Sequence, residues 1–298
     1  MQNHQRLSIE EFGKILIQSN DLDPVYCALY TMMEGDVLSQ EHLSRWILAY
    51  SCLYHCGVAS YLSEFEGEAF FKALMVAAWN EEPSPVGERW PRGHERRHWR
   101  GAQAVDSCKA LWDRYHREPE HFLDYVIWQY AADGERGHPT TFADISERVR
   151  THRGFGGWIA FKLADMIDRL QLRRVEFNYD DVTIYTDPVK AAERLVRQRN
   201  GFPETASVKP EAVKAVFEAL EEHFSNYPAP PVGDRPIGLQ EVESILCKWK
   251  SHMNGHYPLY NDIREIREGL LPWAEVSEVA GFFRAAMPKL PAEKKVAA

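Results

Sequence analysis

The chain has 298 residues, of which 45% are hydrophobic and 27% charged; these values are typical of a globular protein and exclude a disordered or fibrous chain. Its formal net charge of −9 excludes a uniformly basic nucleic-acid coat, although basic charge could still be concentrated locally. No apolar run approaches the roughly 18 residues needed to span a bilayer, the N-terminus has no signal-peptide core, and an odd number of cysteines argues against a disulfide framework. We therefore expect a soluble chain in a reducing cytoplasm, with no membrane partner.

Helical patterns dominate the first half of the chain. Ser8 and Glu11 form a capping-box pattern ahead of the first apolar helix. Residues 39–63 repeat apolar side chains at three- and four-residue steps, which predicts one long, central, buried helix. The same spacing predicts three further helices, over 66–79, 103–116 and 120–132.

A second capping-box pattern, Thr141 with Asp144, predicts a short helix that ends at Arg150. Strand patterns are nearly absent, and only residues 181–185 (DVTIY) are predicted to be extended. The sequence therefore predicts an all-α fold.

Two stretches rich in proline and glycine interrupt the helices. Residues 81–101 are predicted to form a long loop, of the kind that often carries function, and residues 227–238 a semi-rigid linker. We expect an α-helical body over 1–226, then this linker, and then a helical C-terminal subdomain over 239–298 that packs on the body.

Positive charge is concentrated in two segments. Residues 89–100 contain five arginines against Glu95 alone. Residues 148–174 contain six arginines and one lysine against two aspartates. Because the rest of the chain is strongly acidic, these two segments indicate a binding site for a polyanion.

The most informative segment is 152–169, HRGFGGWIAFKLADMIDR, within a predicted hairpin at about 141–174. Its glycines and Ala160 match the G-h-G-x-x-x-A core of a helix-hairpin-helix. Such glycines permit a tight turn, and the second helix directs its N-terminal amides at a backbone phosphate. The alternative is a helix–helix turn without a ligand, but the surrounding basic charge favours DNA. The candidate DNA-binding residues are Arg153, Gly154, Gly156, Gly157, Trp158 and Lys162.

This segment resembles the hairpin of the DNA glycosylase superfamily. The resemblance implies an all-α, helix-hairpin-helix glycosylase-like fold, a catalytic aspartate after the hairpin, and a monovalent cation held by hairpin carbonyls. Two positions depart from the pattern. Trp158 stands where glycosylases with lyase activity have a nucleophilic lysine, and Glu176 stands where the aspartate would fall. The acidic candidates are instead Asp180, Asp181 and Asp187.

Four segments together resemble the bacteriophage thymidine-hypermodification transferases. This glycosylase-superfamily branch is also called the α-glutamyl/putrescinyl-thymine pyrophosphorylases, or amino acid:DNA transferases. The segments are WRGAQAVDSCKAL (99–111), GFGGWIAFKLADMIDR (154–169), FNYDDVTIYTDP (177–188) and LCKWKSHMNGHYP (246–258).

The resemblance implies an enzyme that acts in the cytoplasm of an infected bacterium. It would displace pyrophosphate from 5-pyrophosphoryloxymethyl-deoxyuridine in double-stranded DNA, using the amine of a free amino acid or polyamine. We expect glycine as the donor because the C-terminal tail suggests a small pocket, with glutamate and putrescine as alternatives.

That chemistry requires cationic groups for the departing pyrophosphate. The best candidates in the loop are His94, Arg96, Arg97, His98 and Arg100. The alternative is that this loop grips the DNA backbone. The tail offers a second set, Lys248, Lys250, His252 and Tyr257, which either completes the amino-acid or pyrophosphate pocket or forms a solvated face.

A base is also needed to take a proton from the incoming ammonium group. We favour Asp180 or Asp187 for this role, with Asp181 as the carboxylate beside Asp180. Asp187 precedes Pro188, which equally predicts a helix N-cap, and the two roles are compatible.

Five aromatic residues could stack an extruded base, although most such residues belong to cores: Trp90, Trp99, Trp158, Trp249 and Tyr257. We expect no metal site, because the Cys52, His55 and Cys56 group lies in an apolar helix and the His94 and His98 pair lacks partners. Two other functions remain open: a monofunctional DNA glycosylase that uses water at the sugar C1′, and a non-catalytic DNA-binding protein.

Overall fold

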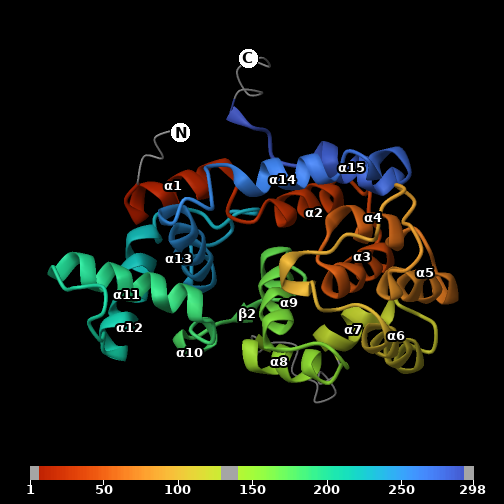
Figure 1. Ribbon diagram of the computed structural model, residues 1–298, viewed down its shortest axis with the longest axis horizontal. Helices are drawn as coiled ribbons and strands as arrows, with labels where there is room; N and C mark the ends of the chain where they lie inside the picture. The colour runs from red at the N-terminus through yellow and green to blue at the C-terminus, as the bar shows by residue number, and fades with distance from the viewer. Residues whose placement is uncertain (1–6, 129–139, 292–298) are drawn as a thin grey trace. The chain divides into compact units, whose positions relative to one another are not determined.

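The structure is a computed structural model that describes residues 7–128 and 140–291 (Figure 1). The described chain is built from helices, and its two strands are two residues long each. The all-α prediction is confirmed. In chain order the elements are α1 (Ile9–Ser19), α2 (Pro24–Glu34), α3 (Gln40–Leu53), α4 (Cys56–Ser63), α5 (Gly67–Trp79), η1 (His94–Arg96), α6 (Ala102–Tyr115), α7 (His121–Trp128), β1 (Thr140–Thr141), α8 (Phe142–Arg150), α9 (Gly157–Arg169), β2 (Val175–Glu176), α10 (Tyr179–Val182), α11 (Thr186–Asn200), α12 (Pro210–Phe224), α13 (Leu239–Met253), α14 (Asn261–Gly269), η3 (Trp273–Glu275) and α15 (Glu278–Ala286).

The chain divides into two compact units. Unit 1 comprises residues 1–27, 176–264 and 288–298, and unit 2 comprises residues 28–175 and 265–287. The proline-rich segment 227–238 lies within unit 1, and the tail that follows it contributes residues to both units. The candidate aspartates and tail residues belong to unit 1, whereas the basic loop and the hairpin belong to unit 2.

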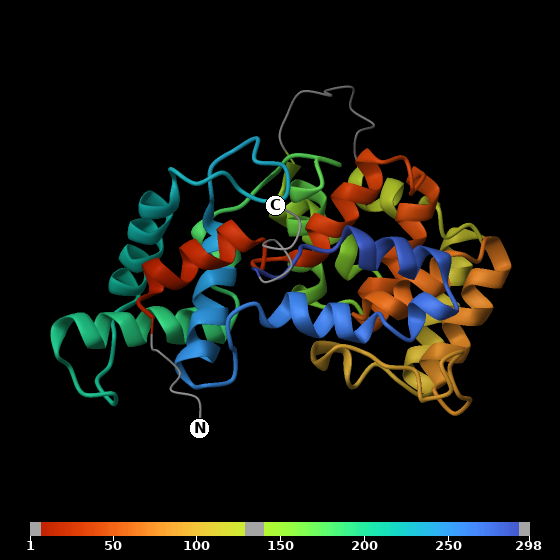
Figure 2. The ribbon, with the colours of Figure 1, turned by 90° about the horizontal axis from the view of Figure 1, so that it is seen from above.

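Unit 1 is a group of helices in which α1, α11, α12 and α13 pack together (Figure 2). Its interior is filled by large apolar side chains: Phe12, Phe217, Phe224, Ile245 and Trp249. The first helix begins as predicted, because Ser8 Oγ accepts a hydrogen bond from Glu11 N (3.2 Å) and Glu11 Oε2 accepts one from Ser8 N (3.2 Å). This reciprocal cap satisfies two backbone donors that the helix itself leaves unpaired.

Unit 2 packs α3 against α4 and α7, α5 against α6, and α8 against α9. Its buried aromatic residues include Trp46, Phe70, Phe122, Phe161 and Phe283. The predicted capping box at the start of α8 is confirmed, since Asp144 N donates to Thr141 Oγ1 and Thr141 N donates to Asp144 Oδ2. Within the described residues, no helix combines the length and apolar character needed to cross a bilayer.

The prediction of one continuous helix over 39–63 was wrong. The segment forms α3 and α4, because Tyr54 adopts a left-handed conformation (φ 52°) that ends α3. His55 then caps α4 by accepting a hydrogen bond from Val58 N at Nδ1 (3.2 Å). This cap gives His55 a structural role.

The prediction of an extended segment over 181–185 was also wrong. Asn178 Oδ1 accepts from Asp181 N (3.2 Å) and Asp181 Oδ2 accepts from Asn178 N (2.8 Å), so a capping box starts the short helix α10. The β-branched side chains that suggested a strand fall at the end of α10 and before α11. The last part of the helix predicted over 120–132 lies outside the described residues.

Candidate functional site

The loop over residues 81–101, here called the arginine loop, is fixed to unit 2 by its backbone. Three of its N–H groups donate hydrogen bonds at or near the ends of α3 and α5: Trp90 to Asn80 Oδ1 (2.8 Å), Gly93 to Leu53 O (2.9 Å) and Gly101 to Ala78 O (2.9 Å). Gly93 must be glycine, because a Cβ there would lie 2.6 Å from the carbonyl oxygen of Tyr54. The loop is therefore an ordered part of the framework.

The arginines of this loop divide into two groups. Arg92 and Arg96 turn inward and donate to backbone carbonyls: Arg92 to Ala77 O (3.1 Å) and Trp99 O, and Arg96 to Cys52 O (3.0 Å) and Gly154 O (3.1 Å). The other cationic candidates of the loop lie at the surface: Arg89, His94, Arg97, His98 and Arg100. Only this second group is placed to meet an anion from solution.

Arg96 is almost enclosed, with 8% of its surface exposed. Its guanidinium carbon lies 5.2 Å from the ring centre of Trp99 and 5.6 Å from that of Phe155. Burial lowers the pKa of Arg96, yet a guanidinium stays protonated at neutral pH. Arg96 thus joins the arginine loop to the hairpin as a buried cation held by carbonyl groups and aromatic rings.

The hairpin consists of α8, a turn over residues 151–156 (the hairpin turn), and α9. Gly154 has a left-handed backbone (φ 82°), and a Cβ there would lie 2.8 Å from Ser107 Oγ. Gly156 and Gly157 differ, because neither has a positive φ and a Cβ at either would meet nothing within 4 Å. Neither backbone strain nor crowding explains glycine at these two positions, and both leave open space at the N-terminus of α9.

Side chains from α6 hold the hairpin turn. Arg114 Nη1 donates to Thr151 Oγ1 (2.6 Å), and Arg153 forms an ion pair with Asp106 (3.5 Å). His152 is buried beside Tyr115, and burial lowers its pKa to about 4, so it is neutral at pH 7. The carbonyl of Gly154 faces the Arg96 guanidinium, which makes it unsuited to hold the monovalent cation that the hairpin pattern implied.

Two other hairpin candidates, Trp158 and Lys162, are half-buried on α9. The Trp158 ring packs edge-on against Tyr54, with ring centres 4.6 Å apart. The Lys162 ammonium lies 5.2 Å from the ring centre of Phe161. Both side chains therefore combine a contact within unit 2 with a partly accessible surface.

The second basic segment also directs much of its charge inward. Arg148 is buried and donates to the carbonyls of Val126 (2.6 Å) and Ile127 (2.7 Å) at the end of α7. Arg169 is buried 3.9 Å from Asp165. The exposed arginines of this segment are Arg150, Arg153 and Arg174. Formal charge along the sequence therefore overstates the charge that faces solvent.

The three candidate aspartates, all in unit 1, have different surroundings. Asp181 caps α10, and burial raises its pKa. Asp187 is exposed and lies 2.6 Å from the ammonium of Lys250, which brings two candidate residues together. Asp187 sits within the first turn of α11, whose N-cap is Tyr185, so the predicted N-cap role was wrong. Asp180 is exposed.

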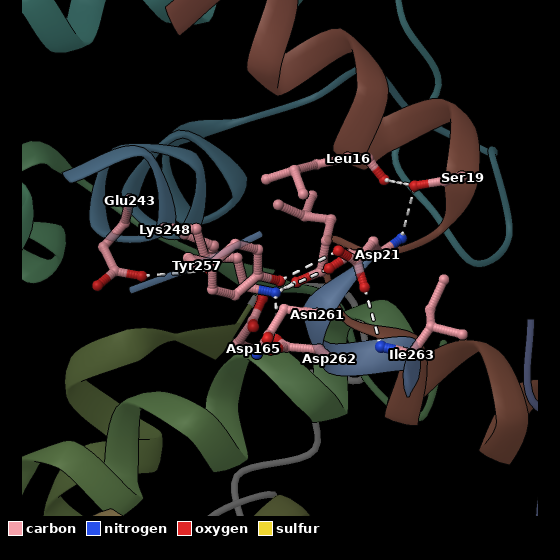
Figure 3. A network of polar contacts seen from close by, with 12 residues as sticks. Leu16, Ser19, Asp21, Asp165, Glu243, Lys248, Tyr257, Asn261, Asp262 and Ile263 are labelled. Carbon is pink, nitrogen blue, oxygen red and sulfur yellow. Dashed lines mark hydrogen bonds and ion pairs between the residues drawn. The ribbon is translucent and has the colours of Figure 1, made fainter. Parts of the chain in front are cut away.

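The other candidates from the tail enter a buried polar network around Asp21 (Figure 3). Lys248 Nζ donates to three acceptors: Asp21 O (2.8 Å), Leu22 O and Asp262 Oδ2 (2.7 Å). The Asp21 carboxylate accepts from Tyr257 Oη (3.2 Å) and Ile263 N (2.9 Å). The ammonium group of Lys248 has three protons to donate, so these contacts use its full capacity.

Burial raises the pKa of Asp21 to about 6, although the charge of Lys248 opposes the shift. Burial alone would lower the pKa of Lys248, but the nearby carboxylates, Asp262 first, raise it. His252 is buried, stacks on Phe12 with ring centres 4.8 Å apart, and bonds Tyr257 O through Nδ1 (2.8 Å). Lys248, His252 and Tyr257 thus stabilise unit 1, and Lys250 is the tail candidate beside an exposed carboxylate.

Sequence reasoning missed Asp21 and Asp262 as partners of these tail residues. Asp21 follows the left-handed Asn20 that ends α1, so from sequence it resembles an ordinary turn residue. It also missed Tyr54, where α3 ends and to which Gly93 and Trp158 both pack.

Comparison with known proteins gives a consistent result. The family model described as amino acid:DNA transferase matches residues 17–256. A glycinyltransferase of Pseudomonas phage PaMx11 is 49% identical over 300 aligned residues, which cover 97% of this chain and 98% of that protein. A putrescinyltransferase of Delftia phage PhiW-14 is 25% identical over 261 residues, which cover 87% of this chain and 77% of that protein.

The protein is therefore an enzyme, a transferase that uses DNA as its substrate. The chain belongs to the amino acid:DNA transferase family. The expectation drawn from the four sequence segments is confirmed, whereas the roles of individual residues and the glycosylase-like character of the fold remain predictions.

Proposed function

We propose that this protein transfers glycine to a pyrophosphorylated base in phage DNA, inside the infected bacterial cell. The supporting observation is the 49% identity to a protein named glycinyltransferase, across nearly the full length of both chains. In the reaction, the glycine nitrogen bonds to the exocyclic methylene carbon of the base. The carbon–oxygen bond breaks, pyrophosphate leaves with the electron pair, and the nitrogen loses a proton.

The exposed cations of the arginine loop fit the leaving group. Guanidinium groups bind phosphate oxygens with paired hydrogen bonds, so Arg97 and Arg100 are assigned to pyrophosphate, with His94 and His98 beside them. Arg96 is assigned a different role, since its hydrogen bonds hold Cys52 O and Gly154 O. Because Arg96 fixes the loop, the exposed arginines lose less conformational entropy when they bind the leaving group.

Of the three candidate aspartates, Asp180 and Asp187 are exposed, and we assign them to accept the proton from the incoming ammonium. Asp181 is less suited, because its carboxylate is engaged in the cap of α10. Lys250, paired with Asp187, gives that carboxylate a fixed position. Duplex DNA is assigned to the hairpin, where the open space at Gly156 and Gly157 lets a phosphate approach the N-terminus of α9.

A product assay tests this proposal. The protein is incubated with duplex DNA that carries 5-pyrophosphoryloxymethyl-uracil, and separately with glycine, glutamate and putrescine, before digestion to nucleosides and mass spectrometry. We expect a glycine adduct and one pyrophosphate released per adduct. Duplex carrying hydroxymethyl-uracil without pyrophosphate is the control and should give no adduct.

The same assay separates the alternatives. Abasic sites and a released base would indicate a DNA glycosylase in place of a transferase. Binding without any product would indicate a non-catalytic DNA-binding protein, and an adduct formed only with glutamate or putrescine would overturn the assignment of glycine.

A further inference from the structure

Among the aromatic residues that could contact a base, the structure distinguishes one by its accessibility. Trp90, Trp99, Trp249 and Tyr257 are each at most 8% exposed. Trp158 is only half-buried, and it lies in the first turn of α9, directly after Gly156 and Gly157. Its ring is therefore the member of this set that a ligand can reach without disrupting a core.

Trp158 is the outermost ring of an aromatic column in unit 2. Trp46 stacks on Tyr50 (4.8 Å between ring centres), Tyr50 packs on Tyr54 (4.6 Å), and Tyr54 meets the Trp158 ring edge-on (4.6 Å, interplanar angle 71°). The inner members are buried, and Tyr54 and Trp158 are half-buried. Packing along the column fixes the outer rings, which lowers the entropy that binding would cost.

The backbone around this pair is also arranged unusually. Tyr54 holds a left-handed conformation (φ 52°), which is uncommon for a bulky side chain. The arginine loop meets it through Gly93, whose backbone reaches so close to Tyr54 that no side chain fits between them. On the other side, Gly156 and Gly157 leave free space next to Trp158. The column therefore ends where the arginine loop and the hairpin converge.

We propose that Trp158, positioned by Tyr54, stacks against one unpaired nucleobase of the DNA substrate. This rests on the proposed function to the extent that the substrate is DNA. The reacting methylene group projects from a base that is stacked in a duplex, so the enzyme must expose that base or distort its neighbours. An aromatic ring beside a phosphate-binding turn replaces the stacking that the base loses, while the turn itself holds the adjoining phosphate.

The chemistry favours a base over other planar ligands. Stacking on an aromatic side chain tolerates any base, because every base presents a π-face. The arginine loop, which meets Tyr54 at Gly93 and the hairpin turn at Arg96, also carries the exposed cations Arg97 and Arg100, which favour a ligand with phosphates. Trp158 is assigned as a binding residue, and Tyr54 as a positioning residue that acts through it.

Two duplexes that carry no pyrophosphorylated base provide the test; they are identical except that one contains a single additional, bulged 2-aminopurine. For Trp158→Ala we expect about 5- to 100-fold weaker binding of the bulged duplex, the range that loss of one stacked base produces. Binding of the paired duplex should change less than about twofold, and the quenching of 2-aminopurine fluorescence on binding should be lost. Trp158→Phe and Tyr54→Phe keep an aromatic ring and should retain most of the wild-type affinity for the bulged duplex. Tyr54→Leu should lose as much of this affinity as Trp158→Ala does.

Two controls separate stacking from general damage. Trp112→Ala removes another half-buried tryptophan of unit 2, one that packs against Phe71 and Arg117, and it should leave both affinities unchanged. Gly156→Asp places a negative charge at the hairpin turn and should weaken both duplexes alike. The thermal midpoints of Trp158→Ala and Trp158→Phe report whether the variants remain folded.

The proposal is overturned if Trp158→Ala binds the bulged duplex normally, or if it loses affinity for both duplexes equally. The assay contains no pyrophosphate and no amine, so its result is independent of the transfer reaction. Selective loss in Trp158→Ala together with no adduct in the product assay would contradict the proposed function alone. A glycine adduct together with unselective binding would contradict the stacking role alone.

Discussion

Unit 1 and unit 2 each contain a cation, Lys248 and Arg96 respectively, that the sequence suggested would bind substrate and that the structure largely encloses. Both donate to backbone carbonyls, but their surroundings differ. Lys248 pairs with the Asp262 carboxylate and uses all three of its donors, so its network is closed. Among the described residues, the hydrogen-bond acceptors of Arg96 are two carbonyls, and these bonds join a surface loop to the hairpin turn.

Chemistry in a basic segment therefore depends on which of its cations remain at the surface. In unit 1 the cation Lys248 stabilises its surroundings through hydrogen bonds to two carbonyls and a carboxylate. In unit 2 the buried cation fixes a surface on which the next arginine, Arg97, is exposed. Neighbouring residues of the same type thus have separate roles, one in the framework and one at the surface.

The largest expected effect tests this separation within the arginine loop. Arg97→Ala should lower the single-turnover rate on pyrophosphorylated duplex by about 100- to 1,000-fold, because charge accumulates on the leaving oxygen in the transition state. Its affinity for unmodified duplex and its thermal midpoint should change far less. Rapid-quench rates and binding isotherms measure the two quantities.

Arg96→Ala is the matched variant one residue away. It should instead destabilise the protein, by roughly 1–3 kcal/mol, because buried carbonyls lose their donors. If Arg97→Ala kept a normal single-turnover rate but bound plain DNA weakly, the exposed arginines would be assigned to the DNA backbone.

The second prediction tests the closed network of unit 1. Lys248→Met leaves the Asp262 carboxylate and two carbonyls without their cation, and should lower the free energy of unfolding by about 3–4 kcal/mol. Lys250→Met, two residues away, breaks a more exposed pair and should cost only about 0–1 kcal/mol. Urea denaturation of both variants measures the difference, and equal losses would show that Lys248 is not a framework residue.

The third and smallest effect concerns pH. Burial raises the pKa of Asp21 to about 6 from its ordinary value of 3.8, so the folded protein keeps a proton that the unfolded chain releases. The stability contributed by this proton is complete below about pH 4 and is lost as the pH rises through about 6.

Asp21→Asn should remove this dependence. Between pH 4.5 and 7.5 the wild type should therefore lose about 2 kcal/mol of unfolding free energy relative to Asp21→Asn. Urea denaturation at several pH values gives both curves. Parallel curves would contradict a raised pKa at Asp21.

The parts of the fold that were predictable from sequence depend on local contacts. The capping boxes at Ser8 and Thr141 were predictable because each joins residues three positions apart. The helices α5 and α6 were predictable because the spacing of their apolar residues marks a buried face, whichever element packs against it. The break at Tyr54 was not predictable, because the residues that pack there, Gly93 and Trp158, are distant in sequence. In the segment 181–185, the β-branched residues predicted a strand, but the capping box at Asn178 starts a helix there instead.

The candidate site follows the same rule. The hairpin glycines and the exposed arginines could be selected from motif and charge, since both are properties of short segments. Whether an arginine faces solvent or a carbonyl depends on distant backbone, as Arg96 shows with Cys52 and Gly154. The Asp21 network likewise joins residues from both ends of the chain, and no local pattern signals it.

The backbone anchors of the arginine loop have a consequence for how such an enzyme changes during evolution. Gly93 is fixed by its approach to Tyr54, and Arg92 and Arg96 are fixed by the carbonyls they bind. Arg89, His94, Arg97, His98 and Arg100 have exposed side chains, and Arg97 donates only to the carbonyl of its near neighbour His94 within the described residues (2.9 Å). Substitutions at these surface positions can alter ligand preference while the loop keeps its path, so new specificities are accessible by single steps without loss of the fold.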